Sequence, residues 1–189
     1  MNFFDTVIVP EGRFQLWAYK AATGQLVDYV EGSNIVVNYG REALARLLGN
    51  HDPGADPPDG VYTGVASWYV DKMKFANGGH DLVDVTIMNA VSVTDTDLNP
   101  HISGVPDTDQ LFEADVTVSW TSFGSRKVTF TANMEAAEGN SPTDLIDPFE
   151  YSEAGLYYSE GSMMFSHKAF GYVVKNSTIR LVATWTFTF

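Results

Sequence analysis

The chain has 189 residues, a formal net charge of −13, no cysteine and a 13% share of aromatic residues. A chain of this length can bury an apolar core without staples, and we expect a single domain over residues 1–189. The lack of cysteine excludes disulfides and thiolate chemistry. The negative charge argues against binding to nucleic-acid phosphates. No apolar run approaches the roughly 18 residues that a membrane-spanning helix needs, and the first residues do not resemble a signal peptide.

The first part of the chain predicts a β-hairpin followed by a helix. Alternating apolar and polar residues at 13–20 and 26–30 indicate two strands, and ATGQ at 22–25 is a typical hairpin connection. In 39–48 four apolar side chains fall on one helical face, namely Ala43, Leu44, Leu47 and Leu48. They predict one short helix that covers an open end or edge of the sheets.

The middle of the chain predicts strands separated by acidic loops. The alternating runs lie at 68–75, 82–93, 111–120 and 126–135. Long stretches rich in proline, glycine and acidic residues lie at 50–64, 94–110 and 138–148. We expect these stretches to be surface loops that make contacts. Their carboxylates predict a solvated acidic face and not a cation site.

The last part of the chain predicts a hairpin and a closing strand. The passage EAGLYYSEGSMMFSHKAF, 153–170, is typical of two strands joined by a turn at Glu160 and Gly161. STIRLVATWTFTF at 177–189 then alternates almost without interruption, with Ile179 to Phe189 on one apolar face. Together the elements predict a mainly β protein. Its architecture is an antiparallel β-sandwich, jelly-roll or immunoglobulin-like, with one short helix and long acidic loops.

Candidate metal ligands do not complete a known pattern. DTDLN, Asp95–Asn99, resembles the start of a calcium-binding loop, but Pro100 and Pro106 stand where that loop requires glycine and glutamate. The four histidines, His51, His80, His101 and His167, lack the spacing of a zinc site. We expect neither a metal nor a cofactor.

Catalytic motifs are also incomplete. No G-x-S-x-G elbow occurs. The acid pairs Glu135 with Glu138 and Glu150 with Glu153 could serve a glycosidase only if folding brought a pair together in a cleft. Such pairs arise by chance in so acidic a chain, and we do not expect an enzyme.

Several motifs occur together in one order. They are GRFQLWAYKAATGQLVDYVEGSNIVVNYGREALARLLGN, VDKMKFANGG, RKVTFTANMEAAEGN, SEAGLYYSEGSMMFSHKAF and LVATWTFTF. In this order the chain resembles a group of small virion proteins of tailed bacteriophages, related to tail-fibre, collar or baseplate attachment domains. It differs from that group in its long acidic loops at 50–64 and 94–110. It also lacks a repetitive shaft, which favours an adaptor, a fibre-base protein or a decoration protein over a full-length fibre.

The resemblance implies a non-enzymatic structural protein of the virion, made in the cytoplasm of the host bacterium. Its partners would be other phage virion proteins, tail or capsid subunits, and copies of itself in a homo-oligomer such as a trimer. A tail-fibre, baseplate or collar adaptor is the first interpretation, and a capsid decoration (cement) protein is the alternative. Separately from the resemblance, exposed aromatic residues such as Tyr62, Trp68 or Tyr69 leave a carbohydrate-binding module as a further alternative. No contact with nucleic acid or membrane is expected.

Partner contacts are expected at two places, the start of the chain and the outer face of the strand at 163–170. The candidate residues are Phe3, Phe4, Met164, Lys168 and Phe170. Glu153 is expected to bond to the backbone or to a lysine, and His167 is expected to be structural and not a ligand.

Overall fold

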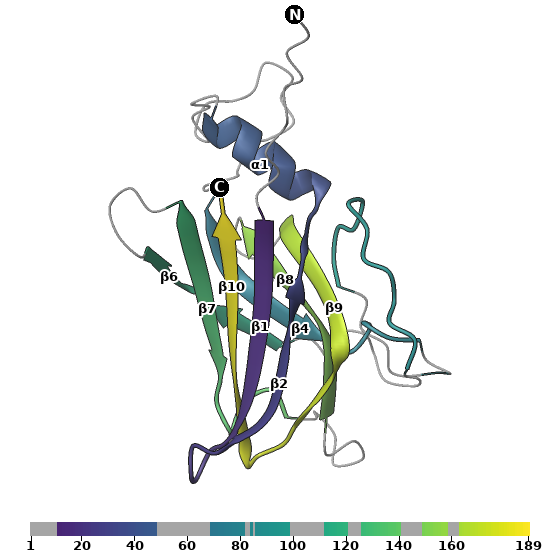
Figure 1. Ribbon diagram of the computed structural model, residues 1–189, viewed down its shortest axis with the longest axis vertical. Helices are drawn as coiled ribbons and strands as arrows, with labels where there is room; N and C mark the ends of the chain where they lie inside the picture. Colours follow the sequence, from purple (N-terminus) through teal and green to yellow (C-terminus); the bar gives the residue numbers. More distant parts are fainter. Residues whose placement is uncertain are drawn as a thin grey trace, which may run out of the picture.

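The computed structural model describes residues 11–48, 69–81, 84, 86–98, 112–120, 126–140, 149–158 and 163–189, and for 45–48 and 120 the backbone alone. Within these residues ten strands form two antiparallel sheets (Figure 1). The first sheet consists, in order, of β2 (Leu26–Ser33), β1 (Glu11–Lys20), β10 (Ile179–Thr188), β7 (Lys127–Met134) and β6 (Thr117–Trp120). The second sheet consists of β3 (Ile35–Val36), β9 (Met163–Lys175), β8 (Phe149–Tyr158), β4 (Val70–Ala76) and β5 (Phe112–Asp115).

The two sheets pack face to face over a shared apolar core. Alternate residues of β10, from Ile179 to Phe187, are buried, and those between them are half-buried. Phe14 of β1 stacks on Phe170 of β9 with ring centroids 5.3 Å apart, and Phe187 meets Phe165 of β9 edge-on at 5.4 Å. The predicted mainly β, antiparallel sandwich with one short helix is thereby confirmed.

The predicted hairpins pair as expected. β1 and β2 are antiparallel neighbours, and so are β8 and β9. The connection between β1 and β2 contains Gly24, whose φ of 68° is the left-handed conformation that glycine adopts without strain. The turn at Glu160 and Gly161 lies outside the described residues. Because β9 and β8 lie at the centre of the second sheet, the 153–170 hairpin supplies the middle of that sheet.

Two strand predictions are wrong. The described residues of 82–93 form no strand, and only an isolated bridge joins His80 to Met88 nearby. The predicted strand 111–120 is two strands, β5 and β6, and they belong to different sheets. The chain passes from one sheet to the other at Val116. Alternation of residues continues on both sides of the crossing, so the pattern gives no sign of it.

The single helix in the described part of the chain, α1 (Asn38–Leu48), lies across one end of the sandwich (Figure 1). Ala43 is fully buried, and Leu44 packs against the core. At Gly40 an added Cβ would lie 2.1 Å from the carbonyl oxygen of Phe165, so only glycine allows the helix to come this close to β9. The helix predicted at 39–48 is confirmed. Within the described residues, no helix has the length and apolar character that crossing a membrane requires.

Candidate functional site

The outer face of the second sheet, which points away from the first sheet, is covered by residues 77–98. We call them the covering segment, which is described except at 82, 83 and 85. It leaves the end of β4 and lies beside β8 and β9 (Figure 1). Its last described residue, Leu98, joins a second apolar cluster, separate from the main core, whose other members are Val37, Ala76, Tyr157 and Met164. The segment therefore gives this sheet a second buried face.

Hydrogen bonds brace a turn within the covering segment. The Asp81 N–H donates to the Ile87 carbonyl and the Asn89 N–H donates to the Gly79 carbonyl, both at 2.9 Å. The side-chain amide of Asn89 also donates to the carbonyls of Gly78 and His80, at 2.8 and 2.9 Å. These bonds hold the two ends of the turn together.

The braced turn exposes two adjacent apolar side chains. Ile87 is 55% exposed and Met88 is 57% exposed. We call this pair the apolar tip. The braced turn therefore carries an apolar surface at its tip.

A buried anchor, formed by Asp95, His167 and Glu153, fastens the covering segment to the sheet. The Nδ1 atom of His167 lies 2.7 Å from Oδ2 of Asp95 in the segment, and its Nε2 atom lies 3.1 Å from Oε2 of Glu153 in β8. His167 is 3% exposed and Glu153 is 1% exposed. Glu153 also accepts a hydrogen bond from the Gly78 N–H at 3.2 Å, so it links the start of the covering segment to His167 of β9.

The electrostatics of the anchor favour a charged histidine. Burial disfavours the imidazolium and is the largest single influence on the pKa of His167. The hydrogen bonds to Glu153 and Asp95, together with the charges of these carboxylates, outweigh burial and raise that pKa above its usual value. With His167 protonated, the anchor joins β8, β9 and the covering segment through ion pairs.

A second polar contact supports the same attachment. The Tyr157 hydroxyl donates to Oδ1 of Asp97 at 2.6 Å and accepts from the Leu98 N–H at 3.2 Å. Burial, followed by the hydrogen bond to Asp97, raises the pKa of Tyr157, so its hydroxyl stays protonated and remains a donor. The Nζ atom of Lys74 lies 4.4 Å from the centroid of the Tyr157 ring and adds a cation–π contact.

The geometry of the anchor suits attachment of the covering segment to the sheet and does not suit catalysis. Both ring nitrogens of His167 are already occupied by carboxylates, and the ring is almost fully buried. General acid–base catalysis needs a group within hydrogen-bond reach of a substrate proton. Among the described residues, no group of three or more His, Cys, Asp or Glu has the arrangement of a metal site.

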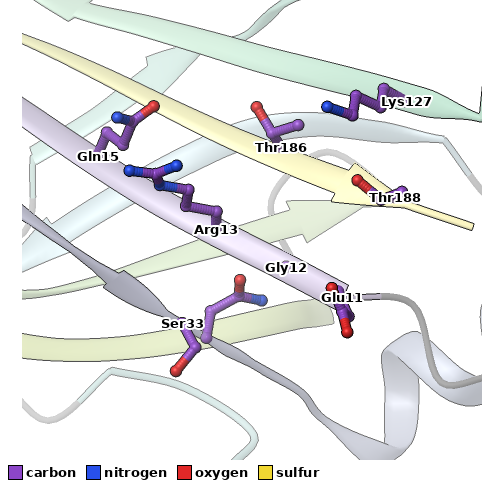
Figure 2. Close-up of a pocket in the computed structure, with 9 residues that line it drawn as sticks. Glu11, Gly12, Arg13, Gln15, Ser33, Lys127, Thr186 and Thr188 are labelled. Atoms are coloured by element: carbon purple, nitrogen blue, oxygen red, sulfur yellow. The ribbon is translucent and has the colours of Figure 1, made fainter.

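The outer face of the first sheet is open and polar. A groove of about 740 Å³ runs over β1, β10 and β7, with Arg13, Gln15, Thr186 and Lys127 among the side chains that line it (Figure 2). Beside the groove Glu31 pairs with Arg13. Hydrogen bonds from Tyr29 and Arg13 hold the pKa of Glu31 below its usual value. Arg13, Gln15, Tyr29 and Glu31 thus form one hydrogen-bonded group on this face.

Aromatic side chains continue this face beyond the groove. The rings of Trp17 and Tyr29 lie 5.5 Å apart with a tilt of 34°, and Tyr29 is 38% exposed. The guanidinium of Arg180 lies 5.2 Å from the centroid of the neighbouring Tyr19 ring. Trp17 is therefore a half-buried residue of an outer face, while Trp185 is fully buried in the core as expected.

The structure corrects the surface predicted for the strand at 163–170. Met164 is fully buried beneath the covering segment, and Phe170 is 2% exposed and packs on Phe14 of the first sheet. Lys168 is half-buried, and burial lowers its pKa. Two irregularities in the pairing of β8 with β9 break the strict alternation and turn these side chains to different faces. None of the three forms an open surface.

The remaining candidate residues have mixed outcomes. Phe3, Phe4, Tyr62 and Trp68 and the loop 50–64 lie outside the described residues, while Tyr69 is 66% exposed. Glu153 bonds to the Gly78 backbone, as predicted. Glu150 and Glu153, which a glycosidase would need together in a cleft, are not placed so, since Glu150 is exposed and Glu153 is buried. Glu138 accepts from the Glu135 N–H at 2.9 Å and braces a turn.

Sequence reasoning missed the link between Asp95 and His167, which lie 72 residues apart. The one available signal was a histidine and a glutamate placed within otherwise apolar strands, since buried ionisable groups need partners. No protein-family model, no curated protein and no solved structure matches the chain.

Proposed function

We propose that this chain is a non-enzymatic structural protein of a tailed-bacteriophage virion that works through protein–protein contacts. Its place would be that of a tail-fibre, baseplate or collar adaptor. Two things support the proposal: the collinear motifs that resemble such proteins, and the apolar tip. The apolar tip, Ile87 and Met88, carries it, because a braced turn keeps both side chains in water where a partner can cover them.

The position in the particle is tested by copy number. Virions of the phage that encodes the chain are purified, and the protein is quantified against the major capsid protein by mass spectrometry. A tail adaptor predicts tens of copies or fewer, whereas a capsid decoration protein, the alternative, predicts hundreds. Absence of the protein from washed virions would overturn both forms of the proposal.

The contact itself is tested by substitution at the apolar tip. The double variant Ile87→Ser/Met88→Ser should lose incorporation into virions while its urea midpoint stays close to that of the unchanged chain, because both side chains are already exposed. The matched control is Leu26→Ser/Val27→Ser, another adjacent exposed apolar pair, 49% and 44% exposed, at the start of β2. Equal incorporation of the two variants would remove the tip from the proposal.

We also propose self-association of the chain, with a trimer as the expected homo-oligomer. Closed symmetry is the usual arrangement of such assemblies and lets one exposed surface serve every copy. Light scattering coupled to gel filtration at several concentrations gives the mass of the assembly. A monomeric mass at every concentration would contradict this part of the proposal.

A carbohydrate-binding module is the second candidate function, favoured by one observation. The tilted pair Trp17 and Tyr29 lies beside a groove with fixed amide, hydroxyl and guanidinium groups, which suits stacking on a sugar ring and hydrogen bonds to its hydroxyls. A glycan array with the unchanged chain, Trp17→Ala and the distant control Tyr172→Ala tests it. Binding that only Trp17→Ala abolishes supports a glycan role, and an array without hits removes it.

A further inference from the structure

We infer that the covering segment is held by a proton-dependent latch, in which protonated His167 fastens Asp95 to the sheet and loss of the proton releases the segment's end. The latch consists of the buried anchor already described, Asp95, His167 and Glu153. The inference concerns how the covering segment is attached, and it does not depend on whether the segment binds a virion protein.

The first step is a count of donors. Each ring nitrogen of His167 faces a carboxylate oxygen, at 2.7 Å for Asp95 and 3.1 Å for Glu153. A neutral imidazole has one N–H, whereas an imidazolium has two, and a carboxylate can only accept. Both contacts are therefore hydrogen bonds at once only when the anchor holds the additional proton. Without it, one nitrogen lone pair faces a carboxylate oxygen.

The second step is the charge around the ring. Two carboxylates contact the ring, Glu153 from β8 and Asp95 from the covering segment. A third, Asp97, lies two residues after Asp95 and bonds to the Tyr157 hydroxyl. Lys74 of β4 lies over the Tyr157 ring. Two carboxylates thus face one histidine directly, and removing its positive charge removes the attraction that it exerts on both.

The neighbours of His167 on its own side of the sheet add no charge. In β3, Ile35 lies opposite His167 in the pairing, and in β8, Gly155 does so. Along β9, Ser166 donates to the Ile35 carbonyl at 2.6 Å. Lys168 lies opposite Ala154, a residue of the main core, so it is on the other face. Among the described residues of β3, β8 and β9 beside the ring, His167 is therefore the group that can carry the positive charge, and Lys74 of β4 follows in the same row beyond Gly155.

The third step identifies the partner that leaves. The Glu153 side chain is 1% exposed and is held by the Gly78 N–H. The Asp95 side chain is 21% exposed and belongs to the segment, where the Ser92 N–H already donates to its Oδ2 at 2.7 Å. Asp95 can exchange His167 for water at a smaller cost than Glu153 can. The end of the segment that carries Asp95 is therefore the part that opens.

The direction with pH follows from linkage. Asp95 contributes to the raised pKa of His167 in the closed state, so the latch is fully effective below the pKa that the ring has in the open state, beside Glu153, and is lost as the pH rises through the closed-state value. Between these two values, opening releases one proton. The opening equilibrium then rises about tenfold for each pH unit.

Hydrogen–deuterium exchange of the full chain tests the latch between pH 5.5 and 9, after correction for the intrinsic exchange rate. Protection of amides in 92–98 should fall by about tenfold per pH unit within the window, while protection in β1 and β10 stays constant. His167→Gln should give low protection at every pH. His80→Gln, a histidine of the same segment outside the anchor, should keep the unchanged profile.

A second measurement covers the case in which His167→Gln does not fold. The ¹⁵N shifts of the His167 ring in the unchanged chain report whether both nitrogens carry protons. The latch requires an imidazolium at pH 6 whose titration coincides with the loss of protection in 92–98. A neutral ring at pH 6 overturns the inference, and so does protection that stays constant while the ring loses its proton.

Discussion

The two sheets of the sandwich share one core but differ on their outer faces. On the first sheet, the outward residues of β10 are half-buried and, except for Val182, polar, as in the threonines at 184, 186 and 188. On the second sheet, every residue of β8 except Glu150 is buried. The difference comes from the covering segment, which packs on the outer face of the second sheet.

This difference explains the composition of the central strands. The strands of a sheet with one solvated face alternate strictly between apolar and polar residues, whereas the strands of a sheet covered on both faces are nearly continuous apolar runs. β8 and β9 follow the second pattern, yet they carry Ser152, Glu153, Ser166, His167 and Lys175 in buried positions. Buried polar groups are tolerated when they are hydrogen-bonded. In Lys175, for example, Nζ donates to two carbonyls and to Oδ1 of Asn140.

The largest expected effect comes from truncating a side chain beneath the covering segment. Met164→Ala removes a fully buried side chain on the outer face of the second sheet and should lower the free energy of unfolding by about 2–5 kcal/mol. The matched change on the first sheet is Val182→Ala, at a half-buried outward position, and should lower it by less than about 1.5 kcal/mol. Urea unfolding monitored by tryptophan fluorescence gives both values. Equal losses would mean that the two outer faces are equally solvated.

Most of the fold could be predicted from the sequence because it rests on local patterns. Period-two alternation in 177–189 and the 3.6-residue pattern in 39–48 each identify an element without any knowledge of its neighbours. The hairpin of β8 and β9 was predicted for the same reason. The prediction of one strand at 111–120 was wrong because the alternation of apolar and polar residues continues where the chain crosses from one sheet to the other.

The anchor could not be predicted, because it depends on contacts distant in sequence. Asp95 lies in a stretch that reads as a solvated acidic loop, and nothing near it indicates a buried partner. The bulges that turn Phe170 toward the core and Met164 away from it are set by pairing between strands and not by the residues of β9 alone. The register of β9 and the face on which each of its side chains lies could therefore be established only from the structure.

Gly79→Ala is expected to have the next largest effect. An added Cβ would lie 1.9 Å from the carbonyl oxygen of Ser152, so the covering segment must shift away from β8. We expect a loss of about 1–3 kcal/mol in the free energy of unfolding. Gly171→Ala is the control, since nothing lies within 4 Å of its added Cβ. A variant Gly79→Ala as stable as Gly171→Ala would show that the segment does not contact the sheet this closely.

Tyr157→Phe isolates the polar part of the attachment. The change removes the hydroxyl that donates to Asp97 at 2.6 Å, and should cost about 1–2 kcal/mol because this carboxylate loses a donor, while the Leu98 N–H keeps its bond to Asp97 Oδ1 at 2.9 Å. Tyr29→Phe on the first sheet removes a hydroxyl from an exposed side chain, and should change stability by less than about 0.5 kcal/mol. The two urea midpoints compare covered and open faces with the same chemical change.

The smallest effect is expected from the threonine pair on the first sheet, and it tests whether that face is as open as it looks. The hydroxyls of Thr129 and Thr186 lie 2.9 Å apart across β7 and β10. The double variant Thr129→Val/Thr186→Val removes both hydroxyls, keeps β-branched side chains of the same shape, and should change the free energy of unfolding by less than about 0.5 kcal/mol. Stabilisation by more than about 1 kcal/mol would indicate that the face is partly covered, because desolvated hydroxyls are then being removed. A null result, set beside the large loss from Met164→Ala, would establish that one face of this sandwich is free for contacts while the other is already occupied by the chain itself.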